Sequence, residues 1–222
     1  MKYFGMPFGM WTLFGGSFRD KLVSTLGYDD KTADEIKRKA KVKYGEIIEK
    51  LPEFEKGDRF KMNIVNASLL AAFMLNMPVK PTVEQVEKYF AESMMTGMMK
   101  KFCESSGKKK FTDKDIEGMK RTAAFRAADR NPYSWNMDYI PYEDGSGYEA
   151  RFYTCGICVL MKELGLSEYV PAMCRLDYTM AGARLRISSG NIPLHLADHT
   201  ATADIKRKSD IFDRQIISRH RR

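Results

Sequence analysis

The chain is poor in several features, and each shortage excludes a class of protein. Four cysteines and three histidines occur in 222 residues. So few cysteines, after an aromatic and glycine-rich start that does not resemble a secretory signal, exclude a disulfide-stapled fold and predict a reducing, cytoplasmic location. No apolar run approaches the roughly 18 residues that a membrane-spanning helix needs, so we expect no membrane contact through a span. The composition therefore predicts a soluble globular protein.

Charge is plentiful and unevenly placed. Lys and Arg number 37 against 29 Asp and Glu, which gives a net charge of +8. The excess is concentrated in residues 37–43 and in the basic tail. A solvated helix face and a frayed terminus account for such runs, against the alternative of a polyanion or membrane-surface contact. No aromatic residues interleave with the basic ones as in a nucleic-acid stacking platform, so we expect no nucleic-acid partner.

The spacing of apolar residues predicts an α+β fold. Helical periodicity runs through residues 32–51, 61–75, 82–102 and 112–128, and again through 157–164 and 168–173. Alternation of apolar and polar residues predicts strands at 148–154, 183–188, 192–197 and 201–206, with a turn at 189–191. We therefore predict a helical region (1–131), an irregular connection (132–147), a small, mainly antiparallel sheet with flanking helices (148–208), and a basic C-terminal tail (209–222).

The segment 148–177 concentrates the groups that can carry chemistry. A predicted strand leads into Cys155-Gly156-Ile157-Cys158, and a helical segment follows. Cys174 comes next, with Asp177 three residues later. Thiols and a carboxylate placed at the ends of strands and helices are suitable for a catalytic or binding site.

These motifs resemble the L-2-amino-thiazoline-4-carboxylic acid hydrolase family. The resemblance begins at Pro7-Phe8-Gly9-Met10-Trp11 and continues through Lys80-Pro81-Thr82-Val83-Glu84. It is most specific in Cys155-Gly156-Ile157-Cys158, Lys162-Glu163-Leu164-Gly165 and Met173-Cys174-Arg175-Leu176-Asp177-Tyr178. The resemblance implies a hydrolase that opens the thiazoline ring of a cyclic cysteine derivative.

The chain departs from the family pattern in its last predicted strand. The family has glycines and then Cys-Asp-Phe-Arg, whereas this chain has His199 and Thr200 for the glycines and Ala203 for the cysteine. The acid at Asp204 and the cation at Lys206 are kept. If the thiol of this segment is essential, the chain is inactive on the family substrate; if Cys155 or Cys174 carries the chemistry, activity remains.

Opening such a ring requires attack on an amidine-like carbon and protonation of the leaving heteroatom. A thiolate with an acid or base partner would serve, as would a water activated by a carboxylate. Arg or Lys suits the substrate carboxylate. The candidates by role are Cys155 or Cys174 as nucleophile, Asp177 or Asp204 as general base, and Arg175, Lys206 and His195 for substrate binding. We expect a pocket between the helical and sheet regions, lined by Cys155, Cys174 and Asp177, with Asp204 near.

Other readings of the same residues stay open. Cysteines often only fill space in a core, and either aspartate suits a cap or an ion pair. A non-catalytic binding or sensor protein on the same scaffold is favoured by the altered strand at 195–206. Cys155, Cys158 and Cys174, with His195 or His199, form the ligand set of an alternative zinc or iron site. In the hydrolase reading we expect a small-molecule substrate and no cofactor; the physiological substrate and a homo-oligomeric state stay open.

Overall fold

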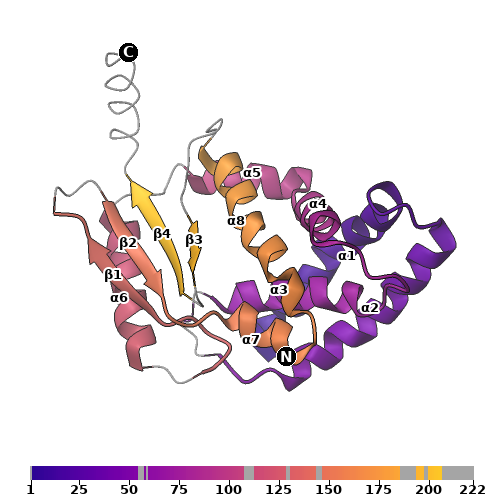
Figure 1. Cartoon of the computed structure of the whole chain (residues 1–222), viewed down its shortest axis with the longest axis horizontal. Helices are drawn as coiled ribbons and strands as arrows, with labels where there is room; N and C mark the ends of the chain where they lie inside the picture. The colour runs from indigo at the N-terminus through magenta and orange to yellow at the C-terminus, as the bar shows by residue number, and fades with distance from the viewer. Residues whose placement is uncertain are drawn as a thin grey trace, which may run out of the picture. The chain divides into compact units, whose positions relative to one another are not determined.

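The computed structural model of the chain describes residues 2–54, 58, 60–107, 113–128, 131–143, 147–185, 194–197 and 200–206. It confirms the α+β fold class. The chain divides into two compact units, each assembled from separate stretches of sequence (Figure 1). The helical unit comprises residues 1–107, 131–133 and 156–188, and the sheet unit comprises 108–130, 134–155 and 189–222. Within the described residues, no helix has the length and apolar character required to span a bilayer.

The helical unit is built from short helices that begin and end at recognisable signals. Its elements are η1 (Lys2–Gly5), α1 (Met6–Ser24), α2 (Asp30–Lys50), α3 (Lys61–Met74), α4 (Val83–Met94), α5 (Gly97–Gly107), α7 (Gly156–Glu163), η2 (Ser167–Tyr169) and α8 (Val170–Leu185). Asp29 caps α2 by accepting a hydrogen bond from the Thr32 amide. Thr82 and Gln85 form a reciprocal capping box at the start of α4. Gly165, at φ +69°, supplies the left-handed residue after α7.

The core of the helical unit centres on aromatic rings that several helices contribute. Phe18 of α1 is completely buried, and its ring contacts those of Phe73, Tyr89 and Phe90 at centroid distances of 5.1, 5.5 and 6.2 Å. The Tyr89 hydroxyl donates to the Phe18 carbonyl at 3.1 Å, which satisfies the polar end of a buried ring. Rings from α1, α3 and α4 therefore fix these three helices against one another.

The sheet unit pairs one helix with a four-stranded antiparallel sheet. It comprises α6 (Asp113–Ala128), β1 (Met137–Pro141), β2 (Gly147–Phe152), β3 (Leu194–Ala197) and β4 (Thr200–Lys206), in the order β1-β2-β4-β3. The predicted strands at 148–154 and 201–206 are confirmed as β2 and β4. Alternation on β2 places Tyr148 and Ala150 in buried positions, and α6 packs beside β1 (Figure 1). The antiparallel sheet expected from sequence is therefore present.

Four of the predicted helices agree with the structure to within about two residues at each end. The segment 82–102, in contrast, forms two helices instead of one. α4 ends at Met94, and Met95 leaves helical geometry with φ −83° and ψ +50°. The Thr96 hydroxyl then accepts a hydrogen bond from the Met99 amide at 3.3 Å, in the manner of an N-cap. This cap favours a new helix start at α5, so the apolar pattern alone overstated the length of the helix.

Three further differences concern elements that sequence patterns missed or misjudged. α1 was not predicted, because glycines and aromatic residues lower helix propensity, and ring packing overrides that preference. Residues 137–141 were placed in an irregular connection but form β1, which pairs with β2 from Met137↔Phe152 to Pro141↔Tyr148. Residues 183–185 were expected in a strand but end α8, since a short apolar alternation fits either structure. The turn at 189–191 and the tail at 209–222 lie outside the described residues.

Candidate functional site

The two units divide the predicted site residues between them. The sheet unit contains Cys155, His195, Asp204 and Lys206, and the helical unit contains Cys158, Cys174, Arg175 and Asp177. The backbone is described at all of these positions, but the side chains of Asp177, His195, Asp204 and Lys206 lie outside the described part, as does all of His199. The expected pocket between helical and sheet regions therefore stays a prediction.

Cys155 lies between the end of β2 and the start of α7. The Tyr153 amide donates to the Asn136 carbonyl at 2.9 Å, and the Asn136 amide donates to the Thr154 hydroxyl at 2.9 Å. These bonds extend the β1–β2 pairing up to the residue before Cys155. The cysteine is half-buried and directly precedes the first residue of α7. Unpaired amides at a helix N-terminus favour a negative group, and a thiolate is one.

Gly156 has a steric reason for its place in the motif. A Cβ atom built on Gly156 would lie 2.0 Å from the Tyr133 carbonyl oxygen and 2.9 Å from Cδ1 of Ile64. No other residue type fits this approach without movement of the backbone. The Tyr133 hydroxyl also donates to the Glu163 carboxylate at the far end of α7. Tyr133 therefore contacts both ends of the helix that follows Cys155.

The environment of Tyr133 shifts its ionisation. Burial raises the pKa of Tyr133 to about 12, and the hydrogen bond and charge of Glu163 act in the same direction. The hydroxyl consequently stays protonated, and a donor, at neutral pH. The contact between Tyr133 and α7 is thus maintained across the physiological range.

The helical-unit candidates differ in exposure. Cys158, in the first turn of α7, is exposed, whereas Cys174 in α8 is half-buried between the buried Met173 and an exposed Arg175. Arg175 Nε lies 3.8 Å from Glu87 Oε2 of α4, with the Arg side chain 64% exposed. Such an exposed pair contributes little stability and leaves the guanidinium accessible. Arg175 is therefore available for an anionic ligand.

The strand register shows how the altered last strand relates to the rest of the sheet. Asp204 pairs with Glu149, Lys206 pairs with Gly147, and Ala203 pairs with Ala150. Ala150 is 1% exposed. Ala203, where the resemblance expects a cysteine, thus pairs with a buried apolar position, while Asp204 pairs with the charged Glu149 of β2. Ala203 and Asp204, as consecutive residues of β4, therefore belong to opposite faces of the sheet.

A second group of polar residues was missed by sequence reasoning, and we call it the charged row: Asp138, Glu149, Arg151 and Tyr153. Arg151 Nε donates to Glu149 Oε1 at 2.8 Å, and the Tyr153 hydroxyl donates to the Asp138 carboxylate. The register places Arg151 opposite Asp138 on one side and opposite Thr202 on the other, with His195 paired to Thr202 in turn. The alternation of β2 was visible in the sequence, but without β1 it predicted only a strand.

These contacts shift the ionisation of two members of the charged row. The hydrogen bond to Glu149, with its charge, raises the pKa of Arg151. The hydrogen bond to Asp138 raises the pKa of Tyr153. Near neutral pH the row therefore contains a cationic guanidinium and a neutral phenol that donates a hydrogen bond.

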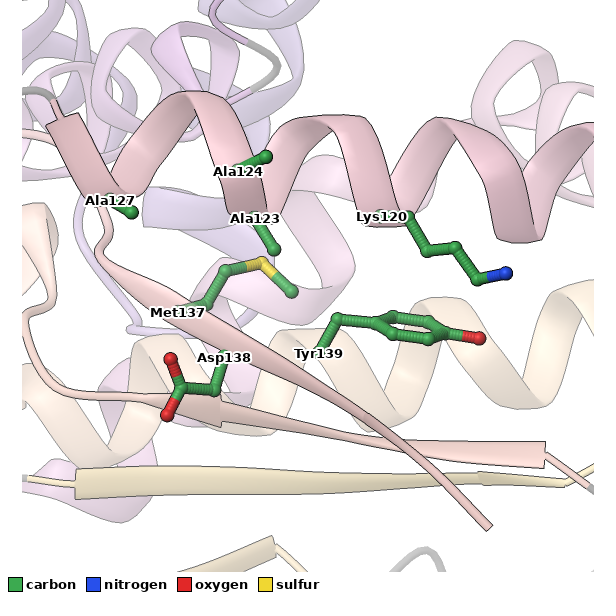
Figure 2. A pocket seen from close by; sticks show the side chains of 7 residues that line it. All are labelled: Lys120, Ala123, Ala124, Ala127, Met137, Asp138 and Tyr139. Carbon is green, nitrogen blue, oxygen red and sulfur yellow. The ribbon is translucent and has the colours of Figure 1, made fainter. Parts of the chain in front are cut away.

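A hollow of about 340 Å³ lies between α6 and β1 (Figure 2). Its lining is Lys120, Ala123, Ala124, Ala127, Met137, Asp138 and Tyr139. Lys120 Nζ lies 5.7 Å from the centroid of the Tyr139 ring, which is within cation–π range. None of the residues proposed for catalysis from sequence lines this hollow. The hollow is open, three alanines form part of its lining, and it results from the packing of α6 on the sheet.

Metal binding receives no support from the described residues. Among them, no three histidine, cysteine or acidic side chains are grouped so that they could hold a metal ion. None of the four cysteines, all of which lie in the described part of the chain, forms a disulfide, so no such bond constrains the motif. The zinc or iron alternative stays a prediction from the cysteine spacing.

Comparison with known proteins identifies the family. The family model described as L-2-amino-thiazoline-4-carboxylic acid hydrolase matches residues 57–189, which is more than half of the chain. The match includes Cys155, Cys158, Cys174, Arg175 and Asp177, and ends before β3 and β4. No curated protein and no solved structure matches the chain. The chain belongs to the L-2-amino-thiazoline-4-carboxylic acid hydrolase family, as its motifs indicated.

Proposed function

We propose that this member of the family is a hydrolase that opens a carbon–nitrogen or carbon–sulfur bond in a small cyclic amidine. The observation that carries the proposal is the family match over residues 57–189, which contains the three motif cysteines and Asp177. The family name indicates a small-molecule substrate, for which 2-aminothiazoline-4-carboxylate is the natural test compound. The overall reaction adds one water: the amidine carbon gains the oxygen of the water, and the two protons pass to the heteroatoms of the opened ring.

Cys155 is the first choice as nucleophile. It is half-buried and directly precedes α7, where helix amides favour a thiolate. Its thiolate would bond to the amidine carbon, the ring bond would then break with protonation of the leaving heteroatom, and water would displace the thiolate. Gly156 and the bonds of Asn136 to Tyr153 and Thr154 support this role, because they fix the backbone on both sides of the cysteine.

The remaining candidates take the roles expected from their chemistry. Cys174 is the alternative nucleophile, and Asp177 or Asp204 is the general base or orienting acid. Arg175 or Lys206 is the anchor for the substrate carboxylate, with His195 a further binding residue. The exposed guanidinium of Arg175, held only at 3.8 Å from Glu87, is consistent with an anchoring role.

The test is turnover of 2-aminothiazoline-4-carboxylate by the purified protein, with Cys155→Ala and Cys174→Ala measured beside it. Cys158→Ala is the matched control, because Cys158 is an exposed cysteine in the same motif. We expect turnover by the wild type, loss of at least about a hundredfold in one of the first two variants, and little change in the control. Full turnover by both Cys155→Ala and Cys174→Ala would rule out a thiol mechanism.

A second candidate is a non-catalytic binding protein for the same class of ligand. Ala203 favours it, because this residue replaces a thiol that the resemblance places in the last strand. A binding protein would be stabilised thermally by 2-aminothiazoline-4-carboxylate but would release no product. Thermal stabilisation accompanied by product release would instead support the hydrolase and exclude the non-catalytic binding protein.

A further inference from the structure

The charged row occupies an accessible part of the sheet unit. Arg151 is 45% exposed and Tyr153 46% exposed, whereas Glu149 is only 19% exposed. In Figure 2, Met137 points toward α6 while Asp138, the next residue on β1, points away from it. The row therefore lies on the side of β1 and β2 that α6 does not cover, within reach of a dissolved ligand.

The charges of the row alternate in sign over short distances. Asp138 and Arg151 are register partners on adjacent strands, and Glu149 is two residues from Arg151 on β2. Adjacent strands lie about 4.8 Å apart, and residues two apart on one strand are separated by roughly 6.6 Å. Cationic and anionic groups are thus presented at spacings close to the dimensions of a five-membered ring with a carboxylate substituent.

Arg151 keeps donors for a further partner. Its Nε donates to Glu149, and the guanidinium also interacts with the Tyr153 hydroxyl. Because a guanidinium has five N–H donors in a planar fork, these contacts orient the group without exhausting it. A guanidinium held in this way is suited to a carboxylate, which accepts two parallel hydrogen bonds.

The charged row contains more acidic residues than basic ones. Asp138 and Glu149 flank the single guanidinium of the row, and the register places another acidic residue, Asp204, opposite Glu149. A bound cationic group would balance this excess of acids. The arrangement therefore accommodates a ligand that carries a positive group as well as a carboxylate.

We propose that the charged row binds a small zwitterion, with Arg151 taking the carboxylate-holding role that sequence reasoning assigned to Arg175 or Lys206, and with Asp138 and Glu149 holding an amidinium-type cation. The identity of the zwitterion as 2-aminothiazoline-4-carboxylate rests on the proposed function. Tyr153 connects the row to the proposed nucleophile along the chain. Its hydroxyl donates a hydrogen bond to Asp138, its amide donates one to the Asn136 carbonyl, and Cys155 follows two residues later. The row is then the specificity-determining part of the site.

The experiment measures binding by calorimetry with three probes that separate the two charges. 2-Aminothiazoline-4-carboxylate carries both groups, 2-aminothiazoline lacks the carboxylate, and thiazolidine-4-carboxylate lacks the amidine. Arg151→Gln removes the cation, and Asp138→Asn removes one acid while keeping an acceptor for the Tyr153 hydroxyl. Arg121→Gln is the matched control, because Arg121 is an exposed arginine on α6 of the same unit.

The expected result is selective. Arg151→Gln should weaken binding of both carboxylates about tenfold or more and leave 2-aminothiazoline unchanged, since a charged hydrogen bond is lost. Asp138→Asn should weaken the two amidines and spare thiazolidine-4-carboxylate. Arg151→Lys should recover part of the carboxylate affinity, and Arg121→Gln should match the wild type.

Two results would overturn the proposal: wild-type protein that binds none of the three probes, or Arg151→Gln and Asp138→Asn proteins that bind all three like the wild type. Turnover separates this proposal from the proposed function. Hydrolysis with an unchanged KM in both variants would leave the hydrolase standing without the charged row. Selective loss of binding in a protein that hydrolyses nothing would leave the charged row standing without the hydrolase.

Discussion

The helical unit and the sheet unit differ in the side chains that they bury. The largest completely buried side chains among the described residues all lie in the helical unit: Tyr89, Phe18, Phe73, Phe90, Leu22, Ile64, Leu69, Leu70, Met94, Met161 and Val65. The sheet unit buries Ala150, Tyr148 and Met137 on one row and presents the charged row on the other. Burial of large apolar side chains provides most of the stability of a fold. The difference indicates that stability resides mainly in the helical unit, and our proposal places ligand recognition in the sheet unit.

The largest expected effect comes from removing a ring of the helical core. Phe18→Ala should lower the free energy of unfolding by about 3–5 kcal/mol, because Phe18 is completely buried against three other rings. Phe8→Ala is the control, with the same substitution on the same helix at a side chain 71% exposed, and should change stability by about 0.5 kcal/mol or less. Denaturant unfolding measures both, and equal effects would contradict the assignment of the core.

The next effect tests the approach of α7 to Tyr133. Gly156→Ala should cost about 3 kcal/mol, because its Cβ would lie 2.0 Å from a carbonyl oxygen of the backbone. Gly45→Ala, in the middle of α2 with no atom within 4 Å of the new Cβ, should instead stabilise by about 0.5–1 kcal/mol. Chemical unfolding of the two variants should therefore give shifts of opposite sign. A harmless Gly156→Ala would refute the close approach.

Two buried tyrosines of the helical unit provide a smaller, matched comparison. No hydrogen-bond partner for the Tyr44 hydroxyl occurs among the described residues, whereas the Tyr89 hydroxyl donates to the Phe18 carbonyl. Tyr44→Phe should be neutral or stabilising by up to about 1 kcal/mol, since it removes a buried group that lacks a partner. Tyr89→Phe should destabilise by about 1 kcal/mol. Thermal unfolding that ranks the two variants the other way would be inconsistent with these environments.

The smallest effect is a dependence of stability on alkaline pH. Burial, with the charges of Glu53 and Glu49, raises the pKa of Tyr3 to about 12 from an ordinary value of 10.0. The folded state then keeps a proton that the unfolded state loses, so stability from this group is complete below pH 10 and is lost between about 10 and 12. Tyr3→Phe should flatten this part of the stability curve. Unfolding curves collected from pH 9 to 12 that are parallel in both proteins would exclude the shift.

Local sequence signals predicted much of the helical unit and only part of the sheet unit. Helices α2 and α3 were predicted almost to their ends, because apolar periodicity runs through both and a proline, Pro52 or Pro78, follows each of them. The break between α4 and α5 depends on one hydroxyl, Thr96, and apolar periodicity does not register it. β1 was missed because its strand character comes from pairing with β2, which apolar alternation within 137–141 does not indicate.

The candidate site shows the same limit. Cys155 and the motif glycine were identified from sequence, but the reason for Gly156 lies in the Tyr133 carbonyl, which is remote in sequence. Glu149, Arg151 and Tyr153 were recognised as one side of a strand. Their grouping with Asp138 required the register, and sequence patterns do not fix a register between unknown partners. Sequence therefore pointed to the thiol that we propose as nucleophile and missed the charged row, which follows from topology.

The most direct test of this division of roles is kcat/KM for 2-aminothiazoline-4-carboxylate, measured with the thermal midpoint on Arg151→Gln and Phe18→Leu proteins. Arg151→Gln should lower kcat/KM about tenfold or more with little change in the midpoint, because Arg151 is an exposed residue to which we assign the substrate carboxylate. Phe18→Leu should lower the midpoint by several degrees and leave kcat/KM of the folded protein unchanged. A wild-type kcat/KM in the Arg151→Gln protein would contradict the assignment of recognition to the sheet unit.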